Sequence, residues 1–176
     1  MSSPLLKVVV PLVNLMVVVA VVHFRRFSWR NDVGLKVPPA SGWGWLVPWV
    51  LWIVEAESLG QQLGVAAVKP FEGLGPGGLA VMFVGMALLA PAGEELLFRG
   101  LLYGRLKATR LREPGAIVVL ALFFAVIHLQ YGWREWIFIF LDALLFGLVR
   151  WRTGSVLVPM VMHMIGNSIA WAQRLP

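Results

Sequence analysis

Long apolar stretches separated by short polar breaks dominate the sequence. The stretches lack the strict alternation of apolar and polar positions that marks β-strands, and most have about the 20 residues that a helix needs to cross a bilayer. The breaks contain glycine, proline and basic residues, which are typical of helix ends and loops. This pattern predicts an all-α fold, a polytopic transmembrane helix bundle with about six spanning helices. The expected helices are residues 4–24, 43–64, 78–110, 114–130, 133–151 and 156–171.

The composition places the chain among membrane proteins. Of its 176 residues, 59% are hydrophobic and 14% are charged, and the mean hydropathy is +0.79. Soluble domains have about 25% charged residues. The length suits one domain, so residues 1–176 are expected to form a single integral-membrane unit. The chain has no cysteine, which excludes disulfides, a thiolate nucleophile and cysteine-ligated zinc.

The net charge of +6 comes largely from basic residues in the polar breaks. The breaks after the first, third and fifth segments hold four, four and two lysine or arginine residues. By the positive-inside rule these breaks face the cytoplasm, and both termini face outward. We therefore expect the lipid bilayer, and no nucleic acid, to be the partner of this charge. Tryptophans such as Trp43 and Trp133 fall at segment ends, as in an interfacial belt.

Three charged side chains, Glu94, Glu95 and Arg99, lie inside the third apolar segment. On a helix, Glu95 and Arg99 are four residues apart and share a face, so they can pair. Glu94 points about 100° away and has no partner on its own helix. A charge at bilayer depth costs about 2.5–3.5 kcal/mol on insertion scales, so an unpaired acid indicates chemistry, and Glu94 is the candidate. Pro91 and Gly93 come just before the acids and predict a kink there.

Two histidines and an asparagine occupy other apolar segments. His128 ends the fourth segment, and His163 and Asn167 lie one turn apart on the sixth. A lone intramembrane histidine is often only a helix–helix hydrogen bond, but this combination with Glu94 favours one shared site. Glu94 could act as a general base toward water, with His128 sharing the proton or orienting the water. His163 and Asn167 could donate hydrogen bonds to an oxyanion.

A metal site is the alternative for the same residues. Glu94, His128 and His163 could form a site of two histidines and one glutamate, as in zinc hydrolases. The sequence has no His-Glu-x-x-His pair on one helix, so we expect no metal and no cofactor. The pattern assigns no role to the remaining acids in apolar segments, which are Glu55, Glu57 and Asp142.

Taken together, the polar motifs resemble those of the CAAX protease and bacteriocin-processing family, the intramembrane proteases related to the Ras-converting enzyme. The resemblance covers residues 79–171, the motif-bearing core. The motifs are Glu94-Glu95-x-x-x-Arg99, Phe124-x-x-x-His128 and His163-x-x-x-Asn167.

The resemblance implies a glutamate-dependent endopeptidase that hydrolyses a membrane-embedded or membrane-anchored protein or peptide. It implies that one Glu and one His activate water, that a His and an Asn form the oxyanion hole, and that an ion pair supports them. The catalytic residues are then Glu94, His128, His163 and Asn167, and the supporting residues are Glu95 and Arg99.

We expect a multi-pass integral membrane protein of a bacterial cytoplasmic membrane. Bacterial members of the family generally have no prenylated substrate, so specificity for CAAX sequences is not part of the expectation. One alternative is a non-catalytic membrane partner, such as an immunity-type protein with the same fold. Another is a proton-coupled transporter, because intramembrane Glu and His also form proton relays, although no inverted repeat is present in the sequence.

Overall fold

The helices of the structure, a computed structural model, follow the predicted segments closely. Within the described residues, 4–64, 71–128 and 131–175, no strand occurs, and the predicted all-α fold is confirmed. Separate helices are α1 (Pro4–Phe24), α2 (Leu46–Gln62), α6 (Arg112–Val126), α7 (Trp133–Thr153) and α8 (Leu157–Ala172), with short turns η1 (Trp29–Val33) and η2 (Ala40–Trp45). One continuous helix comprises α3 (Pro76–Phe83), η3 (Val84–Leu89), α4 (Ala90–Glu95), η4 (Leu96–Leu102) and α5 (Tyr103–Leu106).

Two helices are long and apolar enough to cross a membrane: Pro4–Phe24 and the continuous helix Pro76–Leu106. α2, α6 and α8 have 17, 15 and 16 residues, fewer than the about 20 that a span usually needs. α7 has 21 residues but includes several charged side chains. The number of spanning helices therefore stays a prediction, whereas the apolar helical bundle is established.

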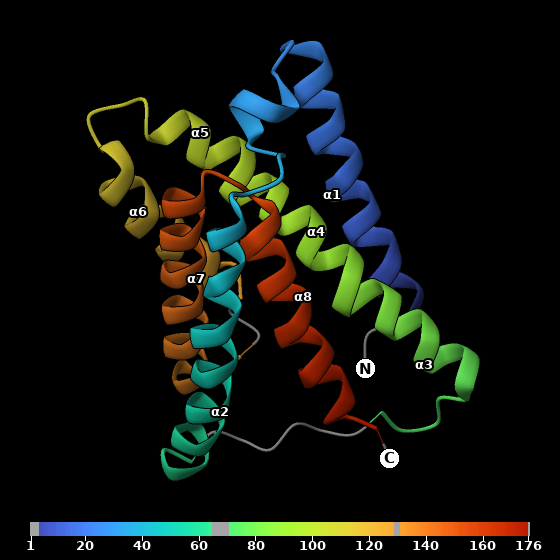
Figure 1. Cartoon of the computed structure of the whole chain (residues 1–176). Helices are drawn as coiled ribbons and strands as arrows, with labels where there is room; N and C mark the ends of the chain where they lie inside the picture. Colours follow the sequence, from blue (N-terminus) through green and yellow to red (C-terminus); the bar gives the residue numbers. More distant parts are fainter. Residues whose placement is uncertain (1–3, 65–70, 129–130, 176) are drawn as a thin grey trace.

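The continuous helix runs diagonally through the bundle and contacts most of the other helices (Figure 1). α1 lies along one side of it, and α8 crosses it near η3 and α4. α6 and α7 pack against each other, and α6 also contacts α5. α2 packs against α7 and α8 at the edge of the bundle (Figure 1).

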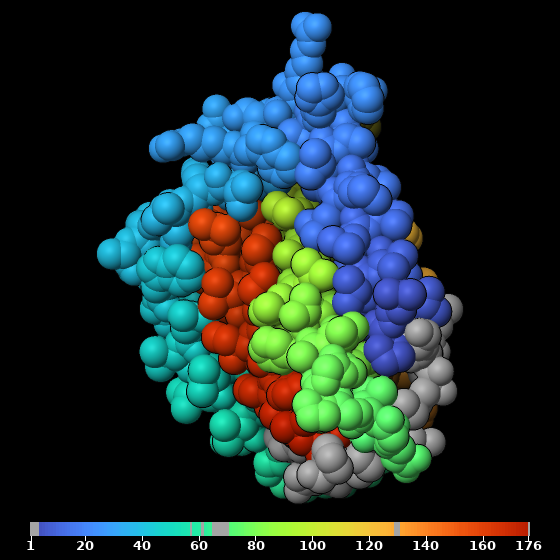
Figure 2. Space-filling view, turned by 90° about the vertical axis from the view of Figure 1, so that its right-hand side faces the viewer, coloured from blue at the N-terminus to red at the C-terminus, as the bar shows by residue number. Residues whose placement is uncertain are grey.

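A close approach of backbones joins α1 to the continuous helix. A Cβ atom at Gly85 would overlap the backbone carbonyl of Lys7, and small residues are what lets membrane helices approach this closely. The outer face of α1 is apolar and exposed, with Val10 and Met16 each 63% exposed, and Figure 2 shows α1 on the outside of the molecule. An apolar face of this extent indicates contact with lipid.

Three buried apolar clusters fill the spaces between the helices. The first joins η4 and α5 to α6 and α7. The second joins α1, η1, η4 and α8, and the third joins α2, α7 and α8. Leu96 and Phe98 of η4 belong to the second and first clusters, so the acids just before them are held by the packed centre of the bundle.

Candidate active site

Two π-helical turns, η3 and η4, enclose the short α4 stretch that carries Glu94 and Glu95. In a π turn the N–H groups bond five residues back, and such turns are frequent at functional sites. Pro91 adds to the irregularity because it has no N–H to donate. The sequence predicted a kink near Pro91, and the structure has widened turns on both sides of α4 within a continuous helix.

Glu95 is fully buried and anchors two side chains from different helices. Its Oε1 accepts hydrogen bonds from Arg99 Nη1 at 2.9 Å and from His163 Nδ1 at 3.0 Å, while its Oε2 is buried without a hydrogen-bond partner. The predicted pairing of Glu95 with Arg99 is therefore present. Arg99 also donates to the Ala143 carbonyl at 3.1 Å, and its guanidinium lies 4.8 Å from the Phe124 ring centre. These contacts join the continuous helix to α6, α7 and α8.

His163 lies between the two glutamates. Since a carboxylate only accepts hydrogen bonds, the contact with Glu95 assigns the proton to Nδ1. The other ring nitrogen, Nε2, faces Glu94 Oε2 at 3.8 Å, which is within ion-pair range but longer than a hydrogen bond. The Phe146 ring packs 5.4 Å from the imidazole. The ring is thus fixed by Glu95, and Nε2 is directed toward Glu94.

Glu94 differs from Glu95 in both exposure and contacts. Its side chain is 24% exposed, whereas that of Glu95 is not exposed. Among the described residues, His163 is the one basic group within 4 Å of its carboxylate. Glu94 is therefore the acid of this pair that can still contact water or a substrate.

His128 approaches the same region from the end of α6. Its Nδ1 lies 2.7 Å from the Phe124 carbonyl oxygen, which can only accept, so Nδ1 carries the proton and Nε2 is free. The ring of Phe124 lies 4.7 Å from that of His128 and 6.0 Å from that of His163. No hydrogen bond or ion pair between His128 and Glu94 occurs in the described part of the chain. A water shared by these two residues stays a prediction.

Asn167 donates a hydrogen bond to a backbone carbonyl that has no partner within the π turn η3. The Ala90 N–H donates to Gly85, and Pro91 has no N–H, so the Met86 carbonyl lacks a partner within its helix. Asn167 Nδ2 donates to that carbonyl at 2.8 Å. The second Nδ2 hydrogen remains for another acceptor. Asn167 therefore ties α8 to the continuous helix near Glu94.

Arg150 makes a similar contact at η4, and the sequence assigns it no role beyond its place near the end of the predicted helix 133–151. The Tyr103 N–H donates to carbonyls on either side of Arg99 in the chain, and Arg150 Nε donates to the Arg99 carbonyl at 2.9 Å. Arg150 is 4% exposed and also donates to the Val33 carbonyl at 3.3 Å. The available signal was its spacing of seven residues from Ala143 on the buried face of α7.

Two tryptophans of α2 donate hydrogen bonds to α8 and α7. Trp49 Nε1 donates to the Met162 carbonyl at 2.9 Å, and Trp52 Nε1 donates to Asp142 Oδ1 at 2.6 Å. Asp142, without a role in the sequence analysis, thus holds α2 against α7. Glu55 is exposed, and the side chain of Glu57 lies outside the described part of the structure.

The zinc alternative would use Glu94, His128 and His163 as ligands. No group of three His, Cys, Asp or Glu side chains is arranged to hold a metal ion within the described ranges. Nδ1 of His128 is bound to a carbonyl and Nδ1 of His163 to Glu95, which leaves the Nε2 atoms open in both rings. The absence of a metal from the reaction stays a prediction.

Comparison with known proteins identifies one family. A family model described as "Type II CAAX prenyl endopeptidase Rce1-like" matches residues 76–169, just over half of the chain. The matched region begins at α3 and ends within α8, and it nearly coincides with the predicted motif-bearing core, 79–171. The chain matches no curated protein and no solved structure.

Proposed function

Because the chain belongs to the Rce1-like family of type II CAAX prenyl endopeptidases, we propose that it is an intramembrane endopeptidase. The predicted relationship to this family is confirmed, and the family is one of membrane proteases. The finer proposal is that the chain hydrolyses a peptide bond in a membrane-embedded or membrane-anchored protein or peptide. Glu94 would be its general base, and the enzyme would need no cofactor.

The main support for this proposal is that the adjacent acids Glu94 and Glu95 have different environments. Glu95 is buried and accepts two hydrogen bonds from cationic or ring donors. Glu94 is partly exposed and faces only His163 Nε2, at 3.8 Å. A general base has to reach the proton that it removes, and of the two acids only Glu94 has an accessible carboxylate. The supporting role expected for Glu95 follows from the same contrast.

The proposed reaction begins when Glu94 takes a proton from water. The water oxygen forms a bond to the peptide carbonyl carbon, and the carbonyl oxygen becomes an oxyanion. The carbon–nitrogen bond then breaks, and Glu94 returns the proton to the leaving amine. His128 Nε2, which carries no proton when Nδ1 donates to Phe124, would accept a hydrogen bond from the attacking water and orient it.

The oxyanion would be stabilised by two donors on α8. With Nδ1 donating to Glu95, a protonated His163 directs its Nε2–H into the space beside Glu94. Asn167 uses one Nδ2 hydrogen on Met86 and has a second for the oxyanion. Removing one fixed donor of this kind from an oxyanion hole lowers the rate by about 10²–10³-fold.

We also propose that the helical segments form a multi-pass protein of a bacterial cytoplasmic membrane. The exposed apolar face of α1 and the apolar continuous helix support membrane insertion. The shorter helices would cross with the bilayer thinned or with their charged ends reaching the interface.

The test is hydrolysis by the purified protein in liposomes of membrane-anchored peptides, with product masses as the readout. We expect fragments whose masses sum to the substrate plus one water, formed without a proton gradient. Asn167→Ala should lower the rate by about 10²–10³-fold. Binding of the peptides without any hydrolysis would instead support the non-catalytic membrane partner, and a requirement for a proton gradient would support a transporter.

A further inference from the structure

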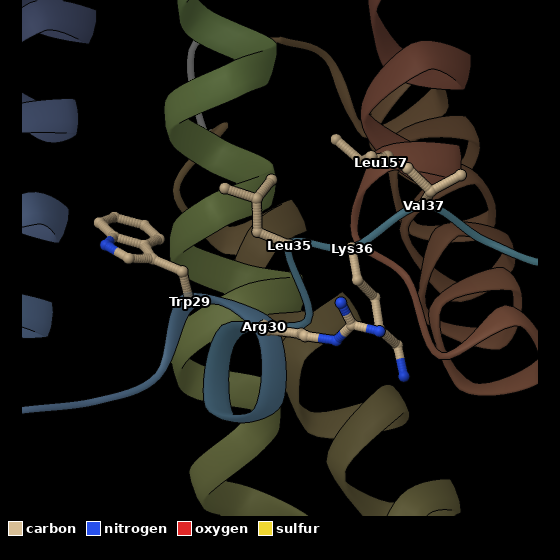
Figure 3. Close-up of a pocket in the computed structure, with 6 residues that line it drawn as sticks. All are labelled: Trp29, Arg30, Leu35, Lys36, Val37 and Leu157. Carbon is tan, nitrogen blue, oxygen red and sulfur yellow. The ribbon is translucent and has the colours of Figure 1, made fainter.

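A pocket unrelated to the acidic pair lies at the end of the bundle where α1 connects to α2. Its volume is about 460 Å³, in the range of about 300–1,000 Å³ found for small-molecule sites. Figure 3 shows the pocket between η1, the chain that follows it and the start of α8. The lining residues are Trp29, Arg30, Leu35, Lys36, Val37 and Leu157.

The chain that carries Leu35, Lys36 and Val37 is fixed by contacts to the turn between α7 and α8. Gly34 has φ of +78° and ends η1, and its carbonyl accepts the Val156 N–H at 2.9 Å. The Ser155 hydroxyl donates to the Lys36 carbonyl. Any Cβ at position 34 would collide with the Arg150 guanidinium, so this glycine is required. The pocket is therefore a built feature of the fold.

The polar side of the pocket is cationic and unneutralised. Arg30 and Lys36 are exposed, and neither has an ion-pair partner in the described part of the chain. Asp32, the acid in the same turn, forms an ion pair with Arg105 at 2.7 Å and accepts a hydrogen bond from the Ser28 N–H at 2.8 Å. Both cationic side chains line the pocket, as Figure 3 shows. Two cations lining one pocket without a carboxylate partner favour an anion there.

The other side of the pocket is apolar and exposed, which favours a lipid over a soluble anion. Val37 is 79% exposed and Leu35 is 36% exposed. Phe24, at the adjoining end of α1, is 80% exposed, and the apolar outer face of α1 leads up to it. Trp29 contributes an indole ring of the kind found at the headgroup level of membranes.

We propose that this pocket binds the phosphate headgroup of an anionic membrane lipid. Arg30 and Lys36 contact the phosphate, while Leu35 and Val37 contact the glycerol and the first part of the acyl chains. Basic pockets at the cytoplasmic interface of membrane proteins are suited to such headgroups. The pocket lies in one of the basic loops that are predicted to face the cytoplasm, so it would face the headgroups of the cytoplasmic leaflet. The proposal does not depend on proteolytic activity.

The experiment measures binding of phosphatidylglycerol to the detergent-solubilised protein by native mass spectrometry, with phosphatidylcholine as the neutral-headgroup comparison. Arg30→Gln/Lys36→Gln should weaken phosphatidylglycerol binding by roughly 30-fold, about fivefold for each interfacial cation. The matched control is Arg110→Gln/Arg112→Gln, which removes the same charge from two exposed positions, one just before α6 and one at its first residue. This control should bind like wild type. Equal weakening in both variants would overturn the proposal in favour of general electrostatic attraction.

A second variant distinguishes a lipid from a free phosphate. Val37→Ser leaves both cations in place and changes only an exposed side chain, so folding should be unaffected. It should weaken phosphatidylglycerol binding severalfold. Inorganic phosphate at millimolar concentration should not displace the lipid from wild type. Full displacement by phosphate, together with no effect of Val37→Ser, would show that the pocket binds a soluble phosphate and would refute the lipid assignment.

Discussion

Replacing Glu95 by glutamine tests the proposed division of roles between the adjacent acids. The carboxylate of Glu95 is buried and neutralises Arg99, which is itself 2% exposed. Glu95→Gln leaves that guanidinium without its counter-ion inside the bundle. Breaking a buried ion pair by removing one partner costs about 3–5 kcal/mol. For a chain of this size each kcal/mol lowers Tm by about 2–4 °C, so the expected fall in Tm is about 6–20 °C.

The assay is thermal unfolding of the purified variants in one detergent, with Glu94→Gln as the matched control. Within the described residues, the one basic group near Glu94 is His163, at 3.8 Å, and the Glu94 side chain is partly exposed, so its loss should cost less than about 1 kcal/mol. Adding Arg99→Met to Glu95→Gln removes the uncompensated charge and should recover part of the lost stability. A Tm for Glu95→Gln within 1–2 °C of wild type, about the shift expected for 0.5 kcal/mol, would refute the buried-pair argument.

Three further predictions concern a metal, a helix contact and a surface ion pair. Exhaustive chelation should leave hydrolysis unchanged, and a loss restored by one metal would contradict this. Gly85→Ala should lower Tm because its Cβ meets the backbone of Lys7, whereas Gly77→Ala, with no atom within 4 Å of its Cβ, should not; equal Tm values would argue against the α1 contact. The Ser28 N–H and then Arg105 hold the pKa of Asp32 below its usual 3.8. The stability that Asp32 contributes is therefore present above about pH 4 and is lost as the pH falls through its lower pKa in the folded state. The Tm difference between wild type and Asp32→Asn should shrink below about pH 4. A difference that stays constant with pH would contradict this prediction.

Local spacing in the sequence predicts only part of the site. The Glu95–Arg99 pair follows from a four-residue separation on one helix, because that rule involves no other element. The helical class and the approximate segment ends follow from apolar length and from glycine and proline. These signals are properties of neighbouring residues, and the structure reproduces them.

Contacts between helices could not be derived from spacing. His163 binds Glu95 across 68 residues of sequence, and no local rule says which acid of the pair it contacts. The π turns depend on which carbonyls the backbone N–H groups near Pro91 and Arg99 bond to. The carbonyls left without a backbone partner accept hydrogen bonds from Asn167 and Arg150. Arg150 lies one residue before the end of the predicted helix 133–151, where a charge is usually solvated. In the bundle its donors are used by carbonyls instead.

In the proposed reaction Glu94 activates the attacking water. Its most direct test is the initial rate of peptide hydrolysis in liposomes by Glu94→Gln, measured beside wild type and beside Glu55→Gln, which neutralises an exposed acid on α2. We expect Glu94→Gln to remain folded and to lose at least about 10² in rate, the lower end for general base catalysis, while Glu55→Gln retains the wild-type rate. Wild-type turnover by folded Glu94→Gln would contradict the assignment of the base.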